Sequence, residues 1–443
     1  MSLIIPANTL ASGGYEVANS LRFNEGSSDE LTRTFGTATS RKIFTLSFWI
    51  KRTNLSGYDS VFFGDTAGSN NADQNSFYFH ENFYLQFGGW NNPFFTSTRL
   101  FRDVSAWYHI VIAVDTTQGT AGNRVKLYVN GVQETYTSGS GFPNQNDDLG
   151  ITKSGNHSWF GNDAQSGRGN GYLAETVLID GTALAPTSFG EFDEDSGIWK
   201  PIDVSGLTFG NNGFYLDFED SSALGADVSG ESNNFTVNNL TAIDQTTDTP
   251  TNNFCTLNPL VPTGGTYTEG NLQYQTATTD GAFCWSSITP SSGGNWYCEA
   301  KMISSTSGTY ILGITTKPIT TSTGRLIYVS NGAVYQGGSQ VATYATFTTN
   351  DIIGMAYNSS TKSLTFYKNG TSQGSVTADQ TDEYFFGSHG QSGGATHTIA
   401  FNFGNPPFAI SSGNTDGDGY GNFEYAVPSG YYALNTKNLA EYG

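Results

Sequence analysis

The chain has 443 residues and a formal net charge of −20, because 39 acidic residues outnumber 19 Lys and Arg residues. Nucleic acid is therefore not an expected partner, since binding to phosphates needs cationic side chains. Only 13% of the residues are charged, whereas 14% are aromatic and 54 are glycine. Surface helices are normally rich in charge pairs, so the composition excludes an all-α protein and favours short strands joined by polar turns.

The sequence predicts no membrane insertion and no secretion signal. No apolar run approaches the roughly 20 residues that cross a bilayer, and no basic residue precedes the short apolar patch at residues 3–5. Cys255, Cys284 and Cys298 are too few for a disulfide framework. We expect buried thiols in a chain that folds in a reducing cytosol, with a Cys284–Cys298 bridge as the alternative.

Alternating apolar residues predict strands along most of the chain. They are clearest at residues 44–51, 108–114, 125–130, 296–303, 352–357, 364–369 and 399–403. Asn-Gly pairs at residues 130–131 and 369–370 are typical of tight type I′ hairpin turns. The only predicted helical segment is a turn or two at residues 186–192. Many short strands with so little helix predict an all-β protein made of β-sandwiches.

A polar segment predicts a boundary between two domains. Residues 241–253 lack apolar periodicity, and prolines and paired glycines follow soon after them. We therefore expect an N-terminal arm at residues 1–19, a first sandwich at 20–240, a linker at 241–265 and a second sandwich at 266–443.

Sequence segments in both halves resemble known domain families. The first half resembles the laminin-G-like branch of the concanavalin A-like lectin/glucanase fold at residues 44–52 (FTLSFWIKR), 107–117 (WYHIVIAVDTT), 126–132 (KLYVNGV) and 171–186 (GYLAETVLIDGTALAP). The second half resembles a SPRY-type domain at residues 294–302 (GNWYCEAKM), 310–315 (YILGIT), 351–370 and 399–408 (IAFNFGNPPF). Together these resemblances imply two concanavalin A-like jelly-roll sandwiches in tandem.

A third resemblance spans nearly the whole chain. The segments that carry it lie at residues 20–24 (SLRFN), 192–201 (FDEDSGIWKP), 212–230, 253–260 (NFCTLNPL) and 423–443. They are similar to a family from tailed bacteriophages of aquatic bacteria whose members are described as virion structural or tail-fibre-like. The resemblance implies a particle protein, made in the host cytoplasm and bound to other virion proteins, without fixing its place on the particle.

Glycan binding needs exposed aromatic faces for stacking, beside amide and carboxylate groups that bind hydroxyls. Turn residues surround two tryptophans that we expect in loops. The predicted carbohydrate-binding residues are Trp90, Asn91 and Asn92 in one loop, and Asn156, Trp159, Asn162 and Asp163 in the other. Tyr328 and Tyr335 are loop candidates in the second domain.

Calcium is the one metal that the sequence supports as a cofactor. Hard cations bind oxygen ligands that alternate along a loop bent by glycine. Asn414, Asp416, Asp418 and Asn422 have such a spacing, although the bidentate glutamate expected at the twelfth position is missing. A polar Asx-turn loop is the alternative. Calcium at the rim of the laminin-G-like domain would use Asp65, Asp73 or Asp163.

Catalysis is not expected. A retaining glycosidase needs two carboxyl groups about 5 Å apart, and the nearest match is Glu191, Asp193 and Asp195, which we interpret as a solvated acidic loop. Asp217 and Glu219 share a face but lack a third acid. The five histidines are scattered, and we interpret His109 as a satisfied histidine within a strand.

These observations favour a non-enzymatic virion protein, a tail-fibre or receptor-binding component that contacts host-surface glycans. A single shallow sugar site binds with about millimolar affinity, so we expect several copies or a homo-oligomer, with a trimer favoured. The alternative is a capsid decoration or tail-assembly protein that binds only other virion proteins. A secreted bacterial lectin is a third possibility.

Overall fold

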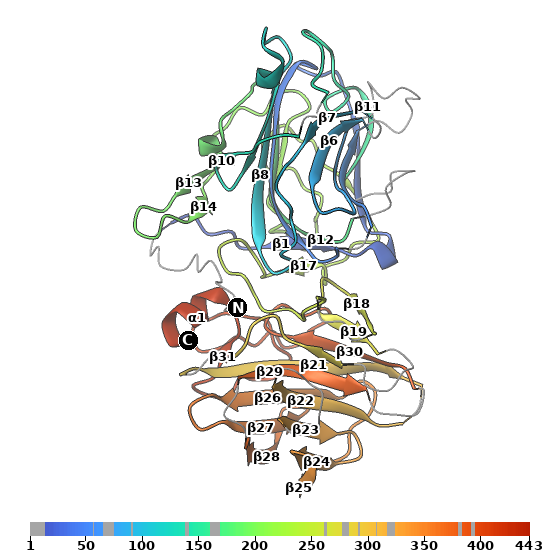
Figure 1. The fold of residues 1–443 in the computed structure, drawn as a ribbon, viewed down its shortest axis with the longest axis vertical. Helices are drawn as coiled ribbons and strands as arrows, with labels where there is room; N and C mark the ends of the chain where they lie inside the picture. Colours follow the sequence, from blue (N-terminus) through green and yellow to red (C-terminus); the bar gives the residue numbers. More distant parts are fainter. Residues whose placement is uncertain are drawn as a thin grey trace. The chain divides into compact units, whose positions relative to one another are not determined.

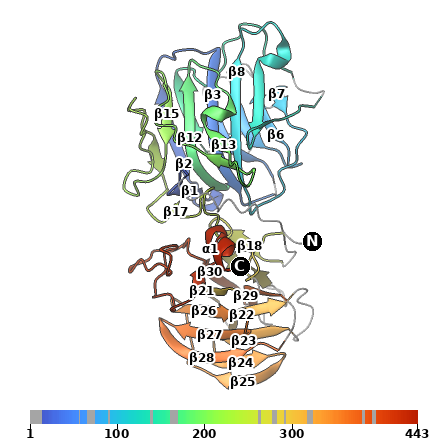
Figure 2. The same cartoon turned by 90° about the vertical axis from the view of Figure 1, so that its left-hand side faces the viewer.

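The computed structural model describes residues 14–55, 57–64, 75–89, 92–137, 141–159, 169–260, 264–276, 283–290, 293–306, 308–316, 324–379, 383–390 and 395–443. These residues form two compact units that meet in the sequence between Thr251 and Asn252. The sheets of both units are built almost wholly from antiparallel strands (Figures 1 and 2). The prediction of an all-β protein is confirmed.

The first unit packs an eight-stranded sheet against a seven-stranded one. The eight-stranded sheet runs in the order β10 (Val132–Gln133), β9 (Val125–Val129), β8 (Trp107–Asp115), β3 (Ile43–Arg52), β12 (Gly171–Asp180), β1 (Ser20–Phe23) and β17 (Gln245–Thr246), with β15 (Phe214–Leu216) also paired to β12. The seven-stranded sheet runs in the order β16 (Thr236–Asn238), β2 (Glu30–Phe35), β11 (Gly155–Trp159), β4 (Asp59–Gly64), β5 (Ser76–Phe79), β6 (Leu85–Gly89) and β7 (Asn92–Thr96). A separate hairpin joins β13 (Gly190–Phe192) and β14 (Trp199–Pro201).

Alternation along the strands decides which side chains form the core of the first unit. In the seven-stranded sheet Phe77, Phe87 and Phe95 are register partners across β5, β6 and β7, and all three are buried in the core. Their neighbours along each strand point to the opposite face, because successive side chains of a strand alternate. The outer face of the seven-stranded sheet therefore carries a different and more polar set of residues, described below.

The second unit also contains two sheets and a short C-terminal helix. The eight-stranded sheet runs in the order β18 (Thr266–Thr268), β19 (Gln273–Gln275), β30 (His397–Asn402), β21 (Asn295–Ser305), β26 (Ile352–Asn358), β27 (Ser363–Lys368) and β28 (Thr371–Thr377), with β31 (Tyr432–Ala433) parallel to β21. The six-stranded sheet runs in the order β20 (Phe283–Trp285), β29 (Tyr384–Gly390), β22 (Tyr310–Thr316), β23 (Arg325–Val329), β24 (Ala333–Gln336) and β25 (Ser339–Thr343). The helix α1 spans Thr436–Tyr442.

The predicted strands and hairpin turns are confirmed within one or two residues. Asn130 and Gly131 have φ values of 48° and 78°, as a type I′ turn between β9 and β10 requires. Asn369 and Gly370, with φ values of 47° and 76°, join β27 to β28 in the same way.

The helical predictions were less accurate. Only Pro186–Ser188 forms a 3-10 turn, because the residues that follow it pair with β14 as strand β13. The helix α1 was not predicted; it begins at Asn435, whose side chain caps it by accepting a hydrogen bond from the backbone N–H of Asn438 at 2.9 Å. Among the described residues no helix is long and apolar enough to cross a membrane.

All three cysteines are buried free thiols in the second unit, and the alternative of a Cys284–Cys298 bridge is therefore not realised. Burial raises the pKa of Cys284 to about 12. Such a thiol stays protonated and unreactive at neutral pH.

Parts of the expected arm and linker pack against the first unit. Residues 1–13 and 261–263 lie outside the described residues, but Val17 is buried and its backbone N–H donates to Thr251 Oγ1 at 3.1 Å. Strand β17, within the segment that we expected to be a linker, pairs with β1. Residues 245–251 thus form part of the first unit's structure.

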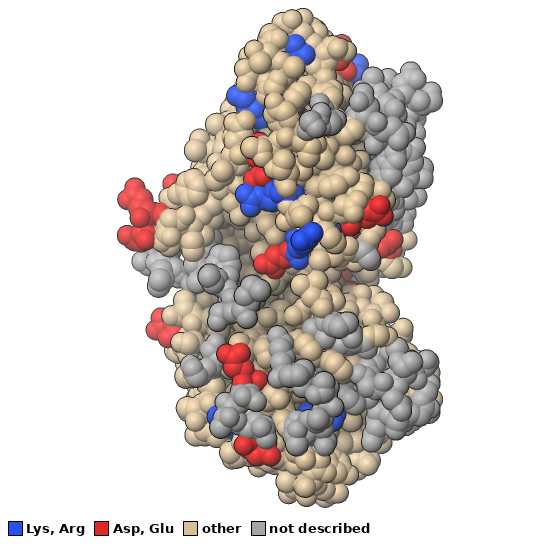
Figure 3. All heavy atoms as spheres, viewed as in Figure 1, with Lys and Arg blue, Asp and Glu red and all other residues tan. Residues whose placement is uncertain are grey.

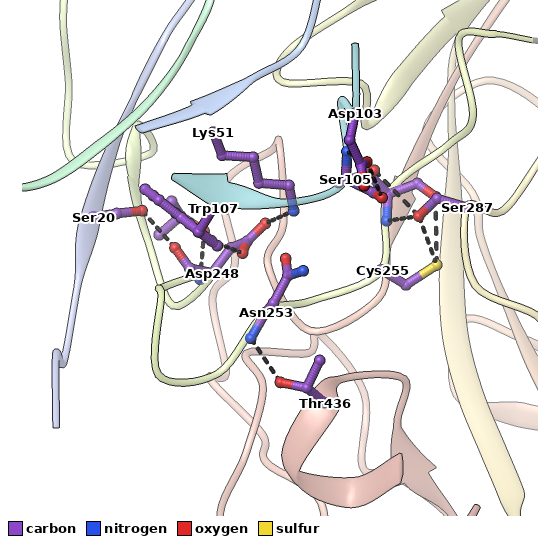
Figure 4. A network of polar contacts seen from close by, with 12 residues as sticks. Ser20, Lys51, Asp103, Ser105, Trp107, Asp248, Asn253, Cys255, Ser287 and Thr436 are labelled. Atoms are coloured by element: carbon purple, nitrogen blue, oxygen red, sulfur yellow. Dashed lines mark hydrogen bonds and ion pairs between the residues drawn. The ribbon is translucent and has the colours of Figure 1, made fainter. Parts of the chain in front are cut away.

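Asp248 anchors this segment in the first unit (Figure 4). Its Oδ2 lies 2.7 Å from Lys51 Nζ, and its Oδ1 accepts a hydrogen bond from Trp107 Nε1 at 3.1 Å. Its backbone oxygen accepts a bond from Ser20 Oγ at 2.6 Å. The side chains of Lys51 and Asp248 are both fully buried. A segment that looks like a solvated linker by composition therefore contributes a buried ion pair.

Candidate functional site

Only three of the seven predicted carbohydrate-binding residues lie among the described residues. Trp90, Asn91, Asn162 and Asp163 lie outside the described residues. Asn92 begins β7, and Asn156 and Trp159 lie on β11, whose backbone pairs with both β2 and β4. Trp159 is thus part of a strand and not of a loop, and the role of these residues in binding stays a prediction.

The two tyrosines proposed for the second domain also lie on strands. Tyr328 is fully buried in the core on β23, so it cannot stack on a sugar. Tyr335 is half-buried on β24. The expectation that these tyrosines lie in loops is therefore wrong, because both belong to a sheet that the sequence analysis left unassigned.

Asp416, the central residue of the predicted calcium loop, is held by protein donors. Its Oδ1 accepts bonds from the backbone N–H groups of Asp418 and Tyr420 at 3.0 and 2.9 Å. Its Oδ2 accepts bonds from Ala433 N at 2.9 Å and from Asn438 Nδ2 at 2.7 Å. This is an Asx-type arrangement that ties the loop to β31 and α1.

The other predicted calcium ligands do not converge on Asp416 with their side chains. Asn414 Nδ2 donates to Ser412 Oγ and to the backbone oxygen of Glu424, at 2.9 and 3.0 Å. At Asn422 it is the backbone oxygen that accepts a bond, from Asn402 Nδ2 at 2.9 Å. Within the described ranges no group of three or more His, Cys, Asp or Glu residues is arranged to hold a metal. The loop thus gives the calcium prediction no support, and Asp65, Asp73 and Asp163 fall outside the described part.

The outer face of the seven-stranded sheet carries a row of polar side chains. Ser60, Tyr78, Gln86 and Thr96 are register partners across β4, β5, β6 and β7. The hydroxyl of Tyr78 donates to Gln86 Oε1, and Gln86 Nε2 donates to Thr96 Oγ1 at 3.1 Å. These hydrogen bonds fix the orientation of the row, which is almost fully buried.

Three half-buried aromatic residues stand beside this row, at the end of the β5–β6 hairpin. The rings of His80 and Tyr84 stack at 4.3 Å between centroids with an interplanar angle of 23°. Tyr58 meets His80 edge-on at 4.6 Å, and its hydroxyl oxygen lies 3.2 Å from His80 Nε2. We call Tyr58, His80 and Tyr84 the aromatic ledge. Its members are only partly covered by the protein, so ring surface is available to a ligand.

The local chain fixes the protonation of the ledge. His80 Nδ1 accepts a hydrogen bond from the backbone N–H of Asn82 at 3.1 Å, so the proton of the neutral ring sits on Nε2 and is directed to Tyr58. Burial lowers the pKa of His80 and raises the pKa values of Tyr58 and Tyr84. All three rings are therefore uncharged at neutral pH.

Exposed polar side chains lie next to the ledge. Glu81 and Asn82 occupy the turn between β5 and β6 and are both exposed. A carboxylate and an amide beside stacked aromatic rings are the groups that bind sugar hydroxyls. Among these residues Glu81 is the sole carboxylic acid, whereas a glycosidase uses a pair.

His109 fills a structural role, as predicted. Its ring stacks on Trp49 at 4.7 Å and on Trp199 at 5.9 Å between centroids. Ser47 Oγ lies 2.9 Å from Nε2, and Trp199 Nε1 donates to Nδ1 at 2.9 Å. Burial lowers the pKa of His109 to about 3. The Ser47–His109 contact is sealed from solvent and cannot serve as a nucleophile and base.

The discounted carboxylates Glu191, Asp193 and Asp195 lie on or beside the β13–β14 hairpin. Glu191 and Asp195 are exposed. Asp193 accepts bonds from Ser196 Oγ at 2.9 Å and from Lys200 Nζ at 3.1 Å. This is the solvated acidic loop that the sequence predicts.

Charged side chains are scattered over the face drawn in Figure 3, and no basic patch gathers on it. A duplex-binding surface normally concentrates Lys and Arg on one face. The view fits the net charge of −20.

The sequence of the first unit matches a known family. Residues 25–186 match the Laminin_G_3 family, described as the concanavalin A-like lectin/glucanases superfamily. The match supports the laminin-G-like resemblance of the first half and includes the whole aromatic ledge. No curated protein sequence matches the chain.

The solved structures that match parts of the chain include a SPRY domain, a bacterial protein and a pentraxin. The SPRY domain of human HERC1 is 16% identical, with 29% of this chain and 87% of that chain covered at a TM-score of 0.28. A protein from Bacteroides ovatus, provisionally described as carbohydrate-binding, is 15% identical, with 51% and 59% covered at a TM-score of 0.34. A pentraxin from Limulus polyphemus is 16% identical, with 36% and 79% covered at a TM-score of 0.24. The part of the chain that a family identifies is thus residues 25–186, which are similar to concanavalin A-like lectins and glucanases.

Proposed function

We propose that this protein is a non-catalytic glycan-binding protein and that the aromatic ledge of its first unit is a sugar-binding site. The observation that carries the proposal is the stacking of half-buried His80 and Tyr84 beside the exposed side chains of Glu81 and Asn82. Aromatic rings that are held by neighbours but still open to solvent lose little entropy when they bind a ligand. The ledge also lies within the segment that matches a lectin-containing superfamily.

We further propose that the protein is displayed on a tailed-phage particle as a tail-fibre or receptor-binding component that contacts host-surface glycans. This proposal rests on the sequence segments at residues 192–201 and 423–443, which resemble virion proteins. A shallow site of about millimolar affinity is effective only in several copies, so a homo-oligomer, with a trimer favoured, fits this role. The second candidate function is that of a capsid decoration or tail-assembly protein, which the same sequence segments support.

Replacing Tyr84 with alanine is expected to weaken glycan binding about tenfold, because it removes one stacking face worth about 1–1.5 kcal/mol. The measurement is retention on an array of bacterial surface polysaccharides and O-antigen oligosaccharides, followed by titration with the retained glycan. The matched control is Tyr136→Ala, which removes a 49% exposed tyrosine outside the ledge. Unchanged retention by the Tyr84 variant, or equal loss in the Tyr136 variant, would refute the ledge as the site.

Gold-labelled antibody on purified particles should decorate the distal tail if the protein contacts the host. Labelling over the capsid shell would instead favour the decoration role. Particles without any label would contradict the virion proposal, while leaving glycan binding by the ledge to be judged on the array.

A further inference from the structure

The outer face of the six-stranded sheet in the second unit contains a strip without side chains. Gly387 on β29 and Gly313 on β22 are register partners on neighbouring strands. Trp285 on β20 pairs with Gly387, and Ile327 on β23 pairs with Gly313. A Cβ atom at Gly313 would collide with the backbone oxygen of Leu326, and one at Gly387 with that of Cys284. The local backbone thus keeps this floor bare.

A shallow pocket lies over this floor. Its lining includes Gly313, Gly387, Ile327 and Arg325, and we call these four residues the glycine trough. Ile327 and Arg325 are half-buried, as is Tyr335, the register partner of Ile327 on the next strand. The trough thus offers a bare backbone floor, an apolar side and a cation.

Arg325 makes no hydrogen bond or ion pair with its side chain among the described residues, and its Nε is buried without a partner. Among the described residues, the other half-buried cations of the second unit have contacts: Lys368 pairs with Asp351 at 3.2 Å, and Lys301 and Lys437 lie over the rings of Phe408 and Tyr420 at 5.2 and 5.3 Å. Lys362 also makes an interaction with its surroundings. Arg325 is the only arginine between residues 252 and 443. Burial without a nearby acid lowers the pKa of its guanidinium.

A half-buried cation without a partner is costly, because its lost hydration is not replaced. An anionic ligand would supply the missing partner. The planar guanidinium fits the two oxygens of a carboxylate. The space over the two buried glycines has room for about one water molecule or one small polar group. Half-buried Ile327 beside it offers an apolar surface to a sugar ring, which an inorganic oxyanion would leave uncovered.

We propose that the glycine trough binds an acidic saccharide residue, with Arg325 pairing with its carboxylate beside Gly313 and Gly387 and its ring lying against Ile327. The site is separate from the aromatic ledge, because it belongs to the other unit. It would give the chain a second specificity, for uronic-acid-type sugars, that the net charge of −20 does not suggest.

The test is a ligand-observed NMR titration of the full chain with trigalacturonate, neutral galactotriose and inorganic phosphate. We expect trigalacturonate to bind at least tenfold more tightly than galactotriose, and Arg325→Gln to lose at least tenfold of that affinity, as loss of a charge-assisted bond predicts. Lys301→Gln, which removes a cation from the other sheet of the same unit, should bind like the wild type.

The stability of the Arg325 variant separates a binding role from a structural one. Because the guanidinium has no partner within the protein, Arg325→Gln should leave the Tm unchanged or raise it. Equal affinity for the acidic and neutral trisaccharides, no binding of either, or full binding by Arg325→Gln would each overturn the proposal. Tighter binding of phosphate than of trigalacturonate would overturn the saccharide assignment. Tyr84→Ala should leave this titration unchanged, so failure of the ledge and failure of the trough are distinguishable.

Discussion

Replacing Asp248 with alanine is expected to destabilise the first unit by about 3–5 kcal/mol, because it removes the carboxylate that pairs with a buried lysine. Lys51 Nζ lies 2.7 Å from Asp248 Oδ2, and both side chains are fully buried. The same carboxylate accepts the indole N–H of Trp107 at 3.1 Å. The substitution thus also removes the acceptor of a second buried donor.

Urea unfolding of the full chain, followed by circular dichroism and tryptophan fluorescence, measures this loss. The control is the double variant Asp248→Ala with Lys51→Met, which removes both charges and should recover much of the stability. A partly exposed pair provides a second reference: Glu134→Gln weakens the contact with Arg99, whose side chain is 44% exposed although that of Glu134 is 7% exposed, and should cost about 1–2 kcal/mol. An Asp248 variant as stable as this reference would show that residues 245–251 do not anchor the unit.

The stability of the first unit is expected to fall as the pH rises from about 5 to 8. Burial, the dominant cause, raises the pKa of Glu175 to about 7, and the nearby carboxylates of Asp217 and Glu219 add to the shift. The hydroxyls of Tyr215 and Tyr15 donate to its Oε2 at 2.7 and 3.0 Å and oppose it. In the unfolded chain a glutamate titrates near about 4.3. Between these values the folded state holds a proton that the unfolded state has released.

The direction in which stability changes with pH follows from this difference in bound protons. Stability is full below the unfolded pKa and is lost as the pH rises through the folded pKa, by up to about 3–4 kcal/mol for Glu175. Glu175→Gln should flatten the dependence of the unfolding free energy on pH. Asp59, whose pKa burial raises to about 6, adds to this fall, whereas His109, whose pKa burial lowers to about 3, opposes it below about pH 6.5. The Glu175→Gln variant should therefore keep little net slope. A Glu175 variant with the wild-type pH profile, or a wild type that gains stability towards pH 8, would contradict the account.

The fold could be predicted because it is written in local patterns. Strand alternation and the Asn-Gly pairs at residues 130–131 and 369–370 are short-range signals that tertiary packing reinforces. The helix α1 depends on the cap at Asn435 and on the link from Asn438 to Asp416, a contact across 22 residues. Asp248 was missed for the same reason: a polar segment looks like a linker unless its buried partner, here almost 200 residues away, is known.

The candidate sites show a similar limit. The sequence analysis predicted Trp90 and Trp159 as binding residues because polar residues surround both tryptophans. The ledge consists instead of Tyr58 and of residues in the turn sequence at 80–84 (HENFY). That turn combines an acid, an amide and three aromatic rings between two strands, which was a usable signal. The sequence shows that Arg325 is the only arginine after residue 252. That its Nε has no hydrogen-bond partner can be seen only in the structure.

Native mass spectrometry of the full chain with array-selected oligosaccharides tests most directly whether the protein binds glycans without cleaving them. The account predicts adducts of the chain with the intact oligosaccharide, whose mass stays unchanged after prolonged incubation. Adducts should be depleted for the Tyr84→Ala variant and retained for Tyr136→Ala. Shortened oligosaccharides would reveal a hydrolase, and the absence of any adduct across the panel would contradict glycan binding.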